Sequence, residues 1–170
     1  MVPVYIRTLI VSTAPAPSVV VLQPNESAVQ DGKYRVVPIW IGMFEASQLS
    51  SAMEGTKFER PMTHDLFLDT LTNLDSCVDH ILINKVKGTT FYAQLVLRHQ
   101  GRLITLDARP SDAISLAVRQ QAPMYIEESV LDRASFPYVT KKPQEELDQE
   151  EELNEFRDFL KDITPEDFES

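Results

Sequence analysis

The chain has 170 residues and a formal net charge of −10, with 43% hydrophobic and 25% charged residues, values that fit one globular domain with an appendage. The single cysteine, Cys77, excludes an intramolecular disulfide and a cysteine-rich zinc site. No apolar run approaches the ~20 residues of a membrane span and no convincing signal peptide is present, so we expect a cytoplasmic protein without a membrane segment.

The first third of the chain predicts three strands and a helix. β-branched residues dominate residues 4–11, 18–23 and 34–41, and turn-forming or polar residues separate the three runs. Pro38 in the third run indicates a sheet edge or a bulge, because proline has no amide proton for a neighbouring strand. Apolar residues at helical spacing over 44–53 then predict a helix.

The central part predicts a helix, an antiparallel meander and a second helix. Thr63 is a suitable N-cap for a helix that runs to about residue 74. Short turns that contain Gly88 and Gly101 join three strands. The strands cover residues 78–86, 90–98 and 103–107. Pro110 begins a helix to about residue 120, which a short strand and a short helix follow. These elements predict an α+β fold with a mixed or antiparallel sheet and packed helices.

The C-terminal part predicts a linker over 134–144 and an acidic amphipathic helix and tail over 145–170. Residues 143–170 hold twelve acidic and two basic residues, which accounts for the whole net charge. The remaining residues are electrically balanced and lack the charge of a general polyanion binder, although a local patch is able to contact phosphate. The tail is a solvated face or a docking segment for a protein partner.

Two polar stretches, residues 54–65 and 106–112, hold most of the chemistry. No GxGxxG, GxxxxGK[ST], GxSxG or HExxH motif is present. A metal-dependent hydrolase needs hard oxygen ligands, often an imidazole, and open positions for water and phosphate. The candidate catalytic residues are Glu45, His64, Asp65, Asp107 and Asp112. Arg60 and Arg109 each precede a proline at a predicted helix start and are candidates for phosphate binding.

The same residues also have purely structural interpretations. Asp65 and Asp112 lie in first helical turns, where an acid stabilises any helix. His64 is also suited to capping or packing, and the two arginines are able to form salt bridges with nearby acids.

Residues 41–49 align weakly with residues 108–116, at an offset of 67. Each segment has a strand end, a short turn, an acid in the first helical turn, and then alanine and leucine on one face. The pattern indicates either an internal duplication of a strand–helix unit or the shared chemistry of strand-to-helix turns.

At these motifs the chain resembles the bifunctional nuclease domain family, over roughly residues 2–133. The matching stretches are PIWIG (38–42) with Glu45-Ala46, RPMTHDL (60–66), TFYAQL (90–95), DARPSDAISLA (107–117) and APMYI (122–126). The resemblance implies an α+β domain, cleavage of both DNA and RNA, and homo-oligomerisation as a dimer or larger assembly. It supplies no established catalytic set, so the site residues named above remain inferences from the motifs.

Our first hypothesis is a metal-assisted phosphodiesterase acting on DNA and RNA. A divalent cation, Mg²⁺ or Mn²⁺, is expected to be held by Asp65, Asp107 and Asp112. Glu45 or His64 assists, and His64 otherwise acts as the general base. Arg60 and Arg109 stabilise the charge that develops on phosphate.

Two alternatives belong to other classes. In the first, the motifs form a salt-bridged dimer core and the acidic tail docks a basic partner, so that the protein is a non-catalytic interaction module. The missing basic stripe favours this alternative. In the second, helix N-termini bind a small phosphorylated ligand.

Overall fold

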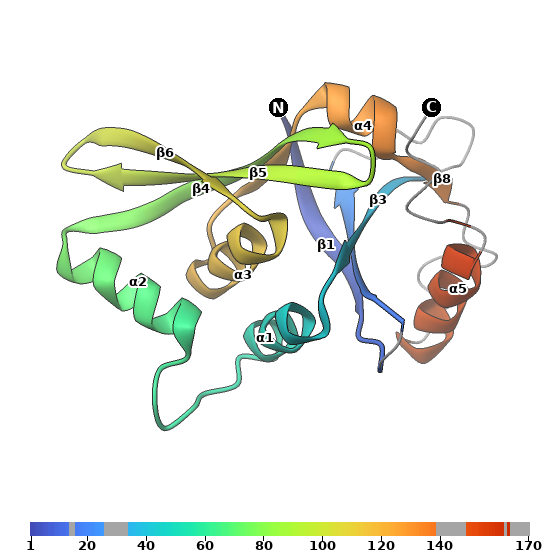
Figure 1. The fold of residues 1–170 in the computed structure, drawn as a ribbon, viewed down its shortest axis with the longest axis horizontal. Helices are drawn as coiled ribbons and strands as arrows, with labels where there is room; N and C mark the ends of the chain where they lie inside the picture. Colours follow the sequence, from blue (N-terminus) through green and yellow to red (C-terminus); the bar gives the residue numbers. More distant parts are fainter. Residues whose placement is uncertain (14–15, 26–33, 139–148, 162, 164–170) are drawn as a thin grey trace.

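The computed structural model describes residues 1–13, 16–25, 34–138, 149–161 and 163, and in this part of the chain five helices pack on one eight-stranded sheet (Figure 1). The strands are β1 (Val2–Ile10), β2 (Ser18–Pro24), β3 (Tyr34–Ile41), β4 (Ser76–Lys87), β5 (Thr90–His99), β6 (Arg102–Ala108), β7 (Met124–Ile126) and β8 (Phe136–Tyr138). The helices are α1 (Met43–Met53), α2 (Thr63–Asn73), α3 (Pro110–Gln120), α4 (Glu128–Ala134) and α5 (Gln149–Lys161). The predicted α+β class is confirmed.

The sheet has the strand order β6-β5-β4-β7-β1-β2-β3-β8. Every neighbouring pair is antiparallel except β4 and β7, which are parallel, so the sheet is mixed as expected. Two meanders, β1-β2-β3 and β4-β5-β6, are joined through the short strand β7. Pro38 lies on the part of β3 beyond Tyr34–Val36, the only residues paired with β8, so its missing amide proton faces an open edge.

The main core lies between the sheet and the helices α1, α2 and α3. Leu49 of α1, Leu71 of α2 and Ile114 of α3 are buried together against Ile81 and Ile83 of β4. α1 and α3 lie side by side beneath the junction of the two meanders (Figure 1). The N-termini of α1 and α3 are thereby brought close together, which positions the site described below.

A smaller second core covers the other face of β1-β2-β3. Alternate residues of a strand point to opposite faces, so Val20 of β2 enters the main core while Val19 and Val21 enter the second one. Phe156 of α5 is fully buried there and stacks on Tyr138, with 4.2 Å between ring centroids. The apolar side of α5 is therefore used inside the chain (Figure 1).

The linker expected over 134–144 differs from the structure at its start. Ala134 ends α4, and Phe136–Tyr138 form β8 instead of a linker, because Tyr138 anchors the strand in the second core. Residues 139–148, and residues 162 and 164–170 of the acidic tail, lie outside the described part of the chain. Within the described residues, none of the helices has the length and apolar character needed to cross a membrane.

Candidate functional site

Arg109 lies at the N-cap of α3, where β6 gives way to the helix, and binds two acids. Its Nε and Nη2 donate to the two carboxylate oxygens of Asp112 at 2.8 and 3.1 Å, and its Nη1 donates to Glu45 at 2.8 Å. Hydrogen bonds to Asp112 and then Glu45 raise the pKa of the Arg109 guanidinium above its ordinary value. Arg109 nevertheless remains 64% exposed, so one side of the cation faces solvent.

The two acids reach Arg109 from equivalent positions of two helices. Glu45 and Asp112 are each the third residue of their helix, α1 and α3, and the N-caps are Gly42 and Arg109. These positions correspond in the alignment of residues 41–49 with 108–116. Two equivalent strand-to-helix turns thus each place an acid against Arg109. The internal duplication itself stays a prediction.

Gly42 allows Glu45 to take its position. A Cβ atom added to Gly42 would collide with the Glu45 carboxylate. The φ angle of Gly42 is −67°, which any residue can adopt, so a larger residue here would displace the Glu45 carboxylate without straining the backbone.

His64 lies in the first turn of α2 and faces the Arg109 cluster. Its Nε2 is 3.5 Å from Asp112 Oδ1, and its side chain is 15% exposed. Its Nδ1 is buried and has no hydrogen-bond partner among the described residues. One ring nitrogen therefore lies close to a carboxylate while the other lacks a partner.

A surface hollow of about 570 Å³ connects these groups. Its polar side chains come from Thr63, His64, Arg109 and Asp112. Phe67 and Leu106 contribute to its apolar lining, and Asp107 borders it from the end of β6. Asp107 is exposed at the end of β6, and its side chain has no hydrogen bond or ion pair within the described part of the chain. Four of the seven residues predicted from the motifs are thus brought to one hollow, and Glu45 joins them through Arg109.

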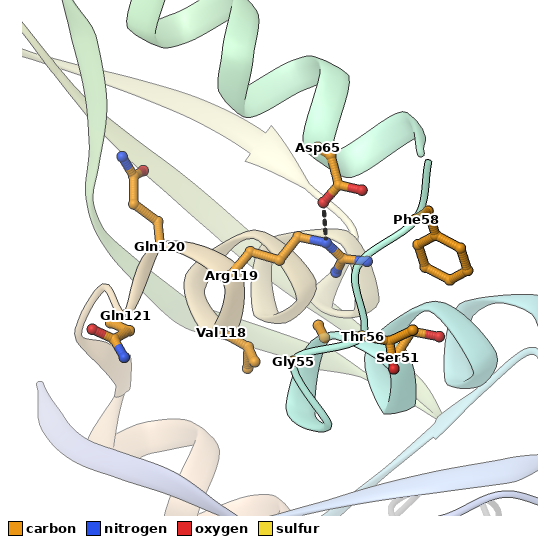
Figure 2. A pocket seen from close by; sticks show the side chains of 10 residues that line it. Ser51, Gly55, Thr56, Phe58, Asp65, Val118, Arg119, Gln120 and Gln121 are labelled. Carbon is orange, nitrogen blue, oxygen red and sulfur yellow. Dashed lines mark hydrogen bonds and ion pairs between the residues drawn. The ribbon is translucent and has the colours of Figure 1, made fainter. Parts of the chain in front are cut away.

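Asp65 is adjacent to His64 in sequence but serves a different set of contacts. One carboxylate oxygen accepts the Met62 amide at 3.0 Å, and the other accepts Arg119 Nε at 2.9 Å. Arg119 is only 9% exposed and also donates to the main-chain oxygens of Gln48 and Ser115. Figure 2 shows Asp65 directed at Arg119 in a separate hollow of about 530 Å³. The contacts of Asp65 are those of a residue that holds α1, α2 and α3 together.

Arg60 is not part of the Arg109 cluster. It is exposed in the connection between α1 and α2 and does not line the hollow that contains His64. Its side chain makes no ion pair with another described residue.

The predicted metal ligands do not assemble within one chain. Asp65 pairs with Arg119, Asp112 pairs with Arg109, and the Asp107 side chain points to the face of β6 opposite to that of Leu106. Across the described residues, no group of three or more histidine, cysteine or acidic side chains is placed to hold a metal ion. The three-aspartate site expected from the sequence therefore does not fit this arrangement.

Arg119 is a site residue that the sequence motifs do not indicate. It is a basic residue in the last turn of α3, a position that favours bases in any helix. Its role depends on the neighbouring helices, so the local sequence carries no specific signal for it.

The comparisons with known proteins are consistent with the motifs. A sequence model described as the bifunctional nuclease domain matches residues 28–138. The uncharacterized protein Rv1829 of Mycobacterium tuberculosis is 35% identical over 136 residues, which are 79% of this chain and 81% of that protein. Bifunctional nuclease 2 of Oryza sativa subsp. japonica is 28% identical over 121 residues, 69% of this chain but only 35% of the rice protein. Bifunctional nuclease 1 of Arabidopsis thaliana is 27% identical over 116 residues, 66% of this chain and 34% of that protein.

Proposed function

The chain belongs to the bifunctional nuclease domain family, and we propose that it hydrolyses phosphodiester bonds in DNA and RNA. The plant relatives that carry the name bifunctional nuclease support this activity. The observation that carries the proposal is the cluster of His64, Arg109 and Asp112 at one hollow, because it offers a proton-transfer group beside a cation. The earlier resemblance to this family is confirmed by the comparisons.

Arg109 supplies the phosphate-binding group in this proposal. A guanidinium has five N–H donors, and three bonds to Asp112 and Glu45 leave donors for a phosphate oxygen on the exposed side. The acids hold the planar group in one orientation before substrate arrives. An oriented cation stabilises the negative charge that grows on phosphate as water attacks.

His64 supplies proton transfer. Imidazole titrates near neutrality and is therefore suited to take a proton from the attacking water. The carboxylate of Asp112 lies 3.5 Å from Nε2, on the side of the ring that faces the hollow. Asp107 borders the same hollow, but it alternates with Leu106 and Ala108 along β6, so its carboxylate belongs to the opposite face of the strand and has no step in this proposal.

The cleavage test described next includes Mg²⁺ and Mn²⁺, although the proposed mechanism assigns no step to a metal ion. The three aspartates expected to bind it are separated, and arginines neutralise two of them. Any cation requirement must therefore be met by a ligand set other than Asp65, Asp107 and Asp112 in one chain.

The test compares cleavage of single-stranded DNA, duplex DNA and RNA in Mg²⁺, Mn²⁺ or EDTA by the wild-type protein and His64→Gln, purified identically. We expect the variant to lose roughly 100-fold or more of the rate. His99→Gln, on β5 outside the hollow, is the matched control and should keep full activity. Equal cleavage by wild type and His64→Gln would contradict the assignment and indicate a contaminating nuclease or a different site.

One observation favours a second candidate function, a non-catalytic interaction module. Glu45, Asp65 and Asp112 are all ion-paired, as in a structural salt-bridge network. In that case the acidic C-terminal segment docks a basic protein partner. Because α5 buries Phe156, the docking test replaces Glu166, Asp167 and Glu169 by amides and leaves the helix intact. Absence of cleavage by the wild type, with a partner lost in this variant, would favour the second candidate.

A further inference from the structure

The two edges of the sheet differ in length and composition. β8 has three residues, and Pro137 among them cannot donate a hydrogen bond to another strand. β6 has seven residues, no proline and no irregularity in its register with β5. Within the described part of the chain nothing covers its open side, and Leu103, Ile104 and Leu106 are 59%, 42% and 40% exposed. A long, regular and apolar edge of this kind favours pairing with another strand.

The hairpin turn determines which peptide groups of β6 are free to pair. Gln100 and Gly101 have φ angles of 48° and 78°, as in a two-residue type I′ turn. The flanking residues His99 and Arg102 then form a hydrogen-bonded pair, and the two kinds of pair alternate along an antiparallel ladder. The peptide groups that point to the open side are those of Leu103, Thr105 and Asp107.

From these observations we propose that two copies of the chain pair through β6, antiparallel, about a two-fold axis at Thr105. A two-fold axis perpendicular to the sheet leaves the helix-covered faces of both copies on the same side. Leu103, Thr105 and Asp107 all find hydrogen-bonding partners only when this axis passes through Thr105. Thr105 then pairs with Thr105 of the second copy, and Leu103 pairs with Asp107 in both directions. This register supplies about six main-chain hydrogen bonds.

The side chains of β6 complement one another in this register. On the helix-covered face, Ile104 of each copy lies opposite Leu106 of the other copy. On the other face, the two Thr105 side chains meet. Arg102 lies opposite Ala108, so no charged side chain of β6 faces a like charge. The two Ile104–Leu106 contacts and the Thr105 pair favour a second copy as the occupant, whereas Leu103 opposite Asp107 adds no side-chain complementarity.

The pairing also brings Arg102 to the candidate site of the other copy. Ala108 lines the hollow that contains His64 and Asp112. Arg102 and Ala108 form a non-hydrogen-bonded pair across the interface, the kind in which side chains lie closest. Arg102 thereby adds a second cation to a hollow that holds Arg109. This last step rests on the proposed nuclease function, whereas the strand pairing does not.

The register is tested by cysteine cross-linking in a Cys77→Ala background. In a hydrogen-bonded pair the Cα atoms are about 5.5 Å apart, and the side chains are farther apart than a direct disulfide prefers, so Thr105→Cys should form a covalent dimer with a short bis-methanethiosulfonate cross-linker. Leu103→Cys lies on the same edge and face, but its two copies would be roughly 13 Å apart and should stay monomeric on a non-reducing gel. No dimer with Thr105→Cys, or equal cross-linking of both variants, would overturn the proposal.

Sedimentation of the full chain without cysteine variants gives an independent measurement. Thr105→Pro removes an amide that points away from β5, so the hairpin is kept and the interface is lost. We expect a wild-type dimer, a monomeric Thr105→Pro with an unchanged far-ultraviolet spectrum, and a dimeric Thr105→Val. A monomeric wild type, or a dimeric Thr105→Pro, would overturn the pairing. Cross-linking and sedimentation both measure molecular mass and not cleavage. A failure of the strand pairing can therefore be distinguished from a failure of the nuclease proposal.

Discussion

Arg109 holds both carboxylate oxygens of Asp112, from Nε at 2.8 Å and from Nη2 at 3.1 Å. The two residues are three positions apart at the start of α3, so the local backbone alone brings them together. The third bond, to Glu45, comes from a residue 64 positions away and depends on the packing of α1 against α3. A local pair and a tertiary contact together fix the orientation of one exposed cation.

Arg109→Lys keeps the positive charge but cannot make the forked contact with Asp112. We expect the rate of nucleic-acid cleavage to fall by roughly 100-fold, because the oriented cation that meets the developing charge is lost. Arg98→Lys is the matched control, since Arg98 is an equally exposed arginine paired with Asp79 on β4, outside the hollow. A full rate in Arg109→Lys would show that orientation of the cation has no part in cleavage.

Gly42→Ala should impair the site through Glu45. The added methyl group displaces the Glu45 carboxylate from Arg109, while the backbone of Gly42 accepts alanine. We expect a folded protein with a cleavage rate reduced about 10-fold, as in Glu45→Gln. The double variant should be no worse than either single variant, because both remove the same contact. Additive losses would contradict this coupling.

Asp65→Asn should affect stability first. It weakens the ion pair with Arg119, whose side chain is largely buried and bridges three helices. We expect a loss of roughly 1–3 kcal/mol in the free energy of unfolding, measured in urea. Asp69→Asn, an exposed residue of the same helix, should change it by less than about 0.5 kcal/mol. Equal free energies of unfolding for the two variants would contradict the structural role of Asp65.

The order of strands within each meander follows from local sequence. Short turns at Gly88 and Gly101 join β4, β5 and β6, and the alternating pattern of each strand defines its length. The parallel pairing of β7 with β4 does not follow, because β7 has three residues and its partner is fixed only when α3 packs on the sheet. The sequence likewise predicts a linker where β8 lies, because the strand character of β8 depends on Tyr138 entering the second core.

The candidate site was predictable in its residues but not in its grouping. His64 and Asp65 are adjacent, but successive helical side chains point about 100° apart, so they enter different hollows. The grouping of Glu45 with Asp112 needs the contact between α1 and α3, which a single sequence does not specify. The grouping of Asp65 with Arg119 depends on the same packing.

Asp79 gives the pH dependence of stability a defined direction. Hydrogen bonds from His80 and Arg98 hold the pKa of the Asp79 carboxyl below its ordinary value of 3.8. A lowered pKa stabilises the folded state above the unfolded pKa, and this contribution is lost as pH falls below 3.8. Asp79→Asn should therefore be less stable than wild type by about 0.5–1 kcal/mol at pH 7, with the difference vanishing in strong acid. A pH-independent difference in urea unfolding would contradict this origin.

Mixing two defective chains tests whether each site uses both copies. Arg102→Ala removes the cation supplied to the other copy, and Arg109→Ala removes the cation of the chain's own site. A mixed dimer contains one site with both arginines, because Arg109 comes from one chain and Arg102 from the other. Co-refolding equal amounts should therefore restore about a quarter of the wild-type sites, and cleavage should rise to about that fraction of the wild-type rate. The control mixes Arg109→Ala with Arg109→Lys, which share the defective position and should not recover. No recovery in the first mixture, with mixed dimers shown by mass, would place Arg102 outside the site even if the β6 pairing holds.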